Sequence, residues 1–214
     1  MLRGFGAIWG RNSYAVKLAK EEESMLRATT IFAVGLIAIA GSNAFADSHE
    51  GTIKKAMPEI MSMIVQDDLI EALRASNTRR GQMTQADIDR LEATWQKEID
   101  SSNRPLIDSV VENDLAARMR EVIARSGNRV NEIGVIDAKG LSIAQSTPNS
   151  DIWQGEEIKF TKTFLVGPEA MFVDEVEFDN STQSMQSQAN FTVKDPVTGK
   201  PIGAVTVGFN VDAL

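Results

Sequence analysis

Residues 195–211 read DPVTGKPIGAVTVGFNV, and this stretch decides the fold. Two prolines and a glycine within residues 195–201 are typical of a hairpin loop, because both residue types supply turn geometry that a strand does not accept. Residues 202–209 are rich in β-branched and small apolar side chains and predict the last strand of an antiparallel sheet. The polar stretch 184–194 predicts its partner strand.

The segments upstream of this hairpin complete a sheet. Residues 130–136 and 141–145 predict a second hairpin around the tight turn Asp137–Gly140. Residues 171–178 alternate apolar and acidic side chains and predict one further strand. A short helical stretch, 151–159, is predicted between the second and third strands. The total is five strands with one helical insertion.

The first half of the mature chain has helical periodicity instead. Apolar residues at three- and four-residue steps predict a helix that begins near Pro58 and ends at a polar break over 77–81. Thr84 predicts the N-cap of a second helix. The most regular apolar face predicts one continuous long helix from Pro105 to Arg125. The predicted fold class is therefore α+β, with N-terminal helices, including one long helix, packed on a five-stranded antiparallel sheet.

The N-terminal region has the features of a secretory leader. Residues 31–40 read IFAVGLIAIA, and a small-x-small pattern ends at Ala46, which predicts a signal peptide cleaved after Ala46 and a periplasmic location. The alternative is a retained membrane anchor, although the apolar stretch is shorter than the roughly 20 residues that span a bilayer. Because acidic residues 21–23 are unusual in such a leader, the true start is either Met1 or Met25.

These boundaries divide the chain into three parts: a leader, 1–46; a helical region, 47–103; and a sheet-containing domain, 104–214. The leader holds 5 of the 22 basic and 3 of the 30 acidic residues, so residues 47–214 carry a net charge of about −10. Such acidity argues against binding to nucleic acid, whose phosphates require a basic surface.

The residue inventory also excludes several kinds of chemistry. The chain has no cysteine, and its single histidine, His49, lies close to the predicted mature N-terminus. Thiol catalysis, thiolate metal sites, a Ser-His-Asp triad and a histidine-rich zinc site are therefore excluded. We expect no enzyme activity, no metal and no cofactor.

Three stretches carry a resemblance to a known family: NEIGVIDAKG at 131–140, DIWQGEE at 151–157 and the closing hairpin at 195–211. Over 105–214 the chain resembles extracytoplasmic sensor domains of the single Cache (PDC-like, PAS-like) type. The resemblance implies a pocket for a metabolite-sized ligand, roofed by 151–157. Receptors of this family continue from the last strand into a membrane helix, whereas this sequence ends at Leu214, which implies a free-standing binding domain that works with a separate membrane sensor or transporter.

Five residues are predicted to contact the ligand: Trp153, Lys159, Phe160, Phe164 and Glu175. Each has an ordinary structural alternative. The three aromatic side chains fit core packing, Lys159 fits a solvated surface, and Glu175 fits an acidic edge that opposes aggregation. Two functions stay open: a small-molecule-binding, sensor-like protein without its own output module, or a structural protein that forms a homodimer or docks on a membrane partner through its helices.

Overall fold

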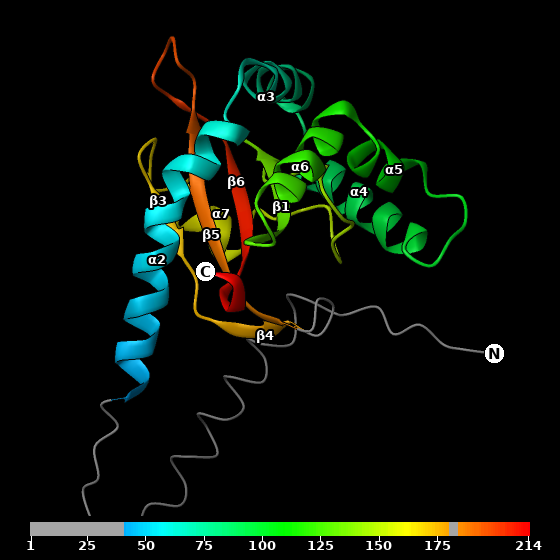
Figure 1. Ribbon diagram of the computed structural model, residues 1–214. Coiled ribbons are helices and arrows are strands. Elements are labelled where there is room, and N and C mark those ends of the chain that lie inside the picture. Colours follow the sequence, from blue (N-terminus) through cyan, green and yellow to red (C-terminus); the bar gives the residue numbers. More distant parts are fainter. Residues whose placement is uncertain (1–40, 180–183) are drawn as a thin grey trace, which may run out of the picture.

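The computed structural model describes residues 41–179 and 184–214 and confirms the α+β class (Figure 1). The described helices are α2 (Gly41–Ile64), α3 (Asp67–Arg80), α4 (Gln85–Glu98), α5 (Pro105–Val111), α6 (Asp114–Arg125), α7 (Ile158–Thr161) and the 3-10 helix η1 (Val211–Ala213). The strands are β1 (Val130–Asp137), β2 (Ser142–Gln145), β3 (Met171–Val173), β4 (Glu177–Asp179), β5 (Ser184–Lys194) and β6 (Pro201–Asn210).

These strands form one antiparallel sheet in the order β2-β1-β6-β5-β3, with β4 also paired to β5. Both predicted hairpins are present, since β1 pairs with β2 and β5 pairs with β6. The sheet has six strands rather than five, because the segment predicted as one strand over 171–178 consists of β3 and β4, separated by residues 174–176.

The two faces of the sheet differ in character. Side chains alternate between faces along a strand, and the face that carries Ile133, Val205 and Phe191 packs in the main hydrophobic core with α2, α3 and α6. The opposite face carries Ile136 and Ala204, which pack with Phe160 of α7. Figure 1 shows α2 in front of β5 and β6 and α7 behind them. The sheet is therefore covered by helices on both sides.

The predicted continuous helix over 105–125 is wrong, because the chain breaks between α5 and α6. The Asn113 side-chain oxygen accepts from the backbone N–H of Ala116 at 2.9 Å, which caps α6. Its amide nitrogen donates to the Ile143 carbonyl at 2.9 Å, so the break is fixed to the strand β2. Among the helices of the described residues, the longest is instead α2, with 24 residues.

Other helix boundaries also differ from expectation. The single helix predicted from Pro58 to the polar break is two helices, because α2 continues through Pro58 and ends at Ile64, and α3 begins at Asp67 and continues to Arg80 through the predicted break. The insertion predicted as helical over 151–159 is helical only over Ile158–Thr161. The N-cap at Thr84 is confirmed, since Thr84 and Asp87 form a reciprocal capping box.

The predicted signal-peptide core at 31–40 lies outside the described residues. The predicted cleavage position after Ala46 lies within α2, and cleavage there stays a prediction. Among the described residues, no helix is long and apolar enough to cross a membrane.

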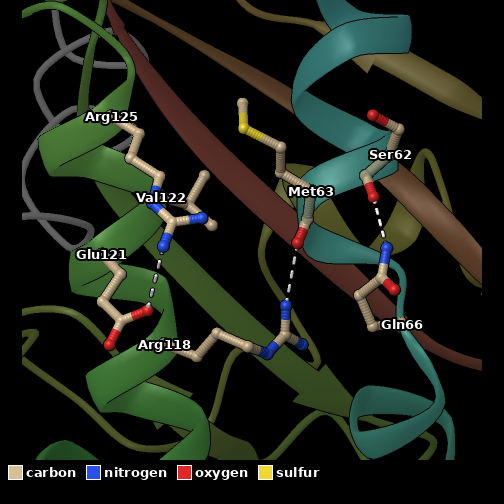
Figure 2. A pocket seen from close by; sticks show the side chains of 7 residues that line it. All are labelled: Ser62, Met63, Gln66, Arg118, Glu121, Val122 and Arg125. Carbon is tan, nitrogen blue, oxygen red and sulfur yellow. Dashed lines mark hydrogen bonds and ion pairs between the residues drawn. The ribbon is translucent and has the colours of Figure 1, made fainter.

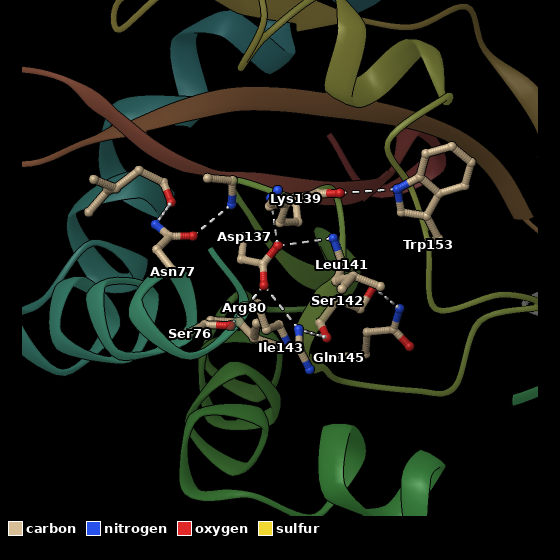
Figure 3. A network of polar contacts seen from close by, with 12 residues as sticks. Ser76, Asn77, Arg80, Asp137, Lys139, Leu141, Ser142, Ile143, Gln145 and Trp153 are labelled. Atoms are coloured by element: carbon tan, nitrogen blue, oxygen red, sulfur yellow. Dashed lines mark hydrogen bonds and ion pairs between the residues drawn. The ribbon is translucent and has the colours of Figure 1, made fainter. Parts of the chain in front are cut away.

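A buried carboxylate connects α3 to the β1–β2 turn (Figure 3). Asp137 is fully buried and accepts hydrogen bonds from the Ser76 hydroxyl at 2.8 Å and the Arg80 guanidinium at 3.0 Å. It also accepts from the backbone N–H groups of Lys139 at 2.9 Å and Leu141 at 3.1 Å. The extension of α3 to Arg80 supplies the cation that this buried charge requires.

We expect Asp137→Asn to lower the free energy of unfolding by about 2–4 kcal/mol, because the change leaves Arg80 without its buried counter-charge. Urea unfolding at pH 7 measures this loss. The matched control is Asp108→Asn, since the Asp108–Arg104 pair at 3.0 Å is exposed and contributes less than about 1 kcal/mol. Equal losses in the two variants would contradict the assigned role of Asp137.

Candidate functional site

The sheet face beneath α7 carries a row of polar side chains. Asn190 and Thr206 are register partners on β5 and β6, and Thr192 lies two residues further along β5 on the same face. All three are buried. Among the described residues, their side-chain oxygens, Asn190 Oδ1, Thr192 Oγ1 and Thr206 Oγ1, are buried without a hydrogen-bond partner. A polar row of this kind is unusual, because most buried polar atoms in native structures are paired.

Residues 150–167, which we call the roof, cover this face, and α4 holds the first part of the roof in place. The Glu92 carboxylate accepts from the backbone N–H groups of Ile152 at 3.1 Å and Trp153 at 3.2 Å. The Gln96 side chain donates to the Ser150 carbonyl at 2.6 Å. The roof is therefore fixed to a helix as well as to the sheet.

The β1–β2 turn holds the roof from the other side. The backbone N–H of Gln154 donates to the Gly140 carbonyl at 2.6 Å, and Trp153 Nε1 donates to the Lys139 carbonyl at 3.0 Å. A Cβ atom at Gly140 would lie 2.4 Å from the Cα atom of Gly155, so only glycine allows the turn and the roof to approach this closely.

A small polar cavity lies between the roof and the sheet. Its polar lining comes mainly from β1, β2, β6 and the roof, and includes Glu132, Ser142, Gln145, Asn149, Gln154, Lys159 and Thr206. The free space is about 10 Å³, which is room for a single water molecule. Two of its lining atoms, Gln154 Oε1 and Thr206 Oγ1, have no partner in the part of the chain that the structure describes. The cavity thus exposes hydrogen-bonding capacity that the described residues do not satisfy.

Asp151 sets the charge beside this cavity. Burial and, to a smaller extent, the nearby Glu92 carboxylate raise the pKa of the Asp151 carboxyl to about 6, while Lys159 opposes the shift. The Gln154 amide nitrogen donates to the Asp151 carboxylate and, at 3.2 Å, to the Asp151 carbonyl. This acidic residue therefore contacts a cavity-lining side chain directly.

The five predicted ligand-contacting residues are not all brought together. Lys159 lines the cavity. Phe160 is buried and stacks on Phe164 with ring centroids 4.9 Å apart, and both pack with Ile136 and Ala204, which is the structural alternative for these rings. They lie in the roof beside the cavity but not in its lining.

Trp153 and Glu175 are outside the cavity lining as well. The Trp153 indole is half-buried, packs against the cluster of α4 and α5, and is engaged with the Lys139 carbonyl. Glu175 is exposed between β3 and β4. Their roles in ligand binding stay predictions.

The sequence interpretation missed Gln154, Asn190 and Thr206. Gln154 lies within the stretch DIWQGEE that was expected to roof the pocket, so its position was available in the sequence. Asn190 and Thr206 had no such signal, since each is one polar residue within a strand. Their importance comes from the register that places them side by side.

A larger hollow of about 340 Å³ lies on the opposite side of the sheet, between α2 and α6 (Figure 2). Arg118, which lines it, donates to the carbonyls of Met63 at 2.8 Å and Ile64 at 3.0 Å and to Asp68 at 2.5 Å. Arg118 is thus occupied in closing the C-terminal end of α2. We place the candidate site at the smaller cavity because two side-chain oxygens of its lining residues, Gln154 Oε1 and Thr206 Oγ1, are buried and have no partner among the described residues.

The chain is similar to solved structures of sensor domains. It is similar to the sensor domain of the V. cholerae histidine kinase DctB, with a TM-score of 0.40 and 14% identity, over 94% of this chain and 58% of that one. It is also similar to the ligand-binding domain of the Campylobacter jejuni chemoreceptor Tlp3 in complex with 4-methylisoleucine, with a TM-score of 0.34 and 11% identity, over 71% of this chain and 60% of that one.

A third similar structure is the ligand-binding domain of the Pseudomonas aeruginosa chemoreceptor PctC in complex with GABA, with a TM-score of 0.36 and 12% identity, over 64% of this chain and 56% of that one. The chain spans less than two thirds of the length of each of them. No family model and no curated protein matches the chain.

The raised pKa of Asp151 predicts a specific pH dependence of stability. The folded state binds a proton more tightly than an unfolded aspartate with a pKa of about 3.9, so the contribution of Asp151 is fully present below about pH 4 and is lost as the pH rises through about 6. We therefore expect Asp151→Asn to raise the free energy of unfolding at pH 7 by about 1–2 kcal/mol, allowing for solvent screening, and to change it little at pH 4. Urea unfolding at both pH values measures the difference.

Asp195 provides a control of opposite sign. Hydrogen bonds from Arg74 and from the backbone N–H groups of Thr198 and Val197 hold the pKa of its carboxyl well below the usual range. The stability that it contributes is present above about pH 4 and is lost as the pH falls further. Asp195→Asn is thus expected to destabilise the protein at pH 7. A loss at pH 7 in both variants would contradict the assignment for Asp151.

Proposed function

We propose that this chain is an exported, sensor-like protein that binds a small polar molecule between the sheet and the roof. The observation that supports this most strongly is the small polar cavity with two unpaired lining atoms, Gln154 Oε1 and Thr206 Oγ1. A buried polar atom without a partner costs about 1–3 kcal/mol. A ligand that pairs with these atoms would recover that free energy, and so the site favours occupancy.

The size of the cavity implies that binding is coupled to movement. A space of about 10 Å³ accommodates one water molecule, so any organic ligand must displace part of the roof from the sheet. The roof contacts α4 through Glu92 and Gln96. These hydrogen bonds hold the first part of the roof, so ligand occupancy would displace its later part, which includes α7, and this displacement gives a binding event a structural readout.

The cellular context of this proposal rests on the sequence. The apolar stretch 31–40 and the small-x-small pattern ending at Ala46 support export through a cleaved signal peptide to the periplasm. We propose a membrane sensor or transporter as the partner that receives the ligand-bound state, with a homodimer as a possible assembly. We propose binding rather than catalysis, because the chain offers no cysteine and only one histidine.

The proposal predicts ligand-dependent stabilisation of purified residues 47–214. A native-state binder at ten times its Kd raises the free energy of unfolding by about 1.4 kcal/mol. A thermal-shift screen of small polar metabolites should identify such a compound. Thr206→Val should abolish its effect and leave the stability of the ligand-free protein unchanged or higher, because the hydroxyl it removes is unpaired.

The matched control is Thr163→Val. Thr163 is also buried in the roof region, but its hydroxyl donates to the Lys159 carbonyl and does not line the cavity. This variant should lose about 1 kcal/mol of stability and keep the ligand-induced shift. Ligand-induced shifts that are equal in Thr206→Val and wild type would contradict the placement of the site.

A further inference from the structure

We infer that Asp151 orients the Gln154 side chain so that the cavity selects ligands carrying an N–H or O–H donor over ligands carrying a carboxylate. This inference rests on the proposed function and specifies the chemical class of the ligand. It makes Asp151 a specificity-determining residue, although Asp151 is not itself among the residues that line the cavity.

The orientation of Gln154 follows from its partners. An amide side chain has one donor end and one acceptor end, and which end faces the cavity is assigned from the hydrogen-bond network. The Asp151 carboxylate and carbonyl both accept from the Gln154 nitrogen. Because both are acceptors, they fix the nitrogen toward Asp151, and the amide oxygen is left unpaired in the cavity lining.

Asn190 on β5 has a similar arrangement, with its amide nitrogen paired and its amide oxygen unpaired. The Asn190 amide nitrogen donates to the carbonyls of Phe172 and Gln188, each at 3.4 Å, which leaves Asn190 Oδ1 as an unpaired acceptor. Asn190 is the register partner of the cavity-lining Thr206. The cavity lining therefore holds the Gln154 amide acceptor and the Thr206 hydroxyl, which both donates and accepts, while the Asn190 acceptor lies beside Thr206 outside the lining. A carboxylate, which only accepts, would place its charge against the Gln154 oxygen.

Lys159 is the residue that would favour the opposite selectivity, since this cationic residue lines the same cavity. Its charge is opposed by Asp151, whose carboxyl it influences electrostatically. Glu132, another acidic residue, also lines the cavity. The charge of Lys159 is therefore offset locally, and the fixed Gln154 acceptor determines which polar group binds.

The test compares three-carbon probes that carry different polar groups: propylamine, 1-propanol and propionate. Their affinities for residues 47–214 are measured by chemical-shift titration at pH 8, where the Asp151 carboxyl is ionised. We expect propylamine and 1-propanol to bind at least about tenfold more tightly than propionate, because a mismatched buried polar group costs roughly tenfold or more in affinity. Tighter binding of propionate would overturn the inference and leave the proposed function standing. If none of the three probes, nor any metabolite in the screen, bound at the cavity, the proposed function itself would fail.

Two variants test the role of Asp151. Asp151→Asn supplies an amide that can donate to the Gln154 oxygen, so Gln154 is free to turn, and the preference for propylamine over propionate should fall about tenfold. Gln154→Met, which removes the acceptor without adding charge, should lose the same preference. The matched control, Asp174→Asn, alters a carboxylate that accepts only from the adjacent Glu175 N–H at 2.9 Å among the described contacts, and should keep it. An unchanged preference in both Asp151→Asn and Gln154→Met would overturn the inference.

Discussion

The buried carboxylate of Asp137 is the constraint on which the site depends. A charge without solvent is costly unless cations and hydrogen-bond donors surround it, and here α3 supplies Arg80 and Ser76 while the turn supplies two backbone N–H groups. This requirement fixes the β1–β2 turn against α3. The same turn presents the carbonyls of Lys139 and Gly140, to which the roof is hydrogen-bonded. The position of the roof therefore depends on the Asp137 carboxylate, which lies outside the cavity.

The two faces of the sheet differ in what they contribute: one carries the main hydrophobic core, and the other carries the candidate site. The face toward α2, α3 and α6 is filled by aliphatic and aromatic side chains and contributes the main hydrophobic core. The face toward α7 places Asn190, Thr192 and Thr206 at positions where apolar residues would pack better. Because the first face stabilises the fold, the second can carry unpaired polar groups at a tolerable cost. Such a division is typical of a site that has not been optimised for stability.

The elements that local chemistry specifies were predictable from the sequence. Proline and glycine placed the β5–β6 hairpin, and the turn at Asp137–Gly140 placed β1 and β2. The break between α5 and α6 was not predictable from periodicity, because apolar spacing continues across it and Asn113 acts through a contact with Ile143, thirty residues away. The extension of α3 to Arg80 was missed for a similar reason. Its polar residues look like a loop until Asp137 is placed beside them.

The candidate site shows the same limit at the level of single side chains. Lys159, one of the predicted ligand contacts, lines the cavity, whereas the aromatic residues Phe160 and Phe164 pack on each other and on the sheet beside it. An aromatic residue can be recognised in a sequence as a candidate ligand contact, but whether an amide oxygen is unpaired can be seen only in the structure. The role of Gln154 depends on tertiary structure: its amide nitrogen donates to Asp151, and its amide oxygen is buried without a partner among the described residues.

The contacts that hold the roof indicate which part of it can move. Its first part, around Ile152 and Gln154, is bonded to both α4 and the β1–β2 turn. Its later part is held to the sheet mainly by the Phe160–Phe164 stack and by Lys162, whose ammonium lies 4.2 Å from the centre of the Phe172 ring. Nondirectional apolar contacts tolerate a shift better than hydrogen bonds of fixed geometry do. A ligand larger than water would thus be accommodated by displacement of α7, while Gln154 keeps the orientation that recognises it.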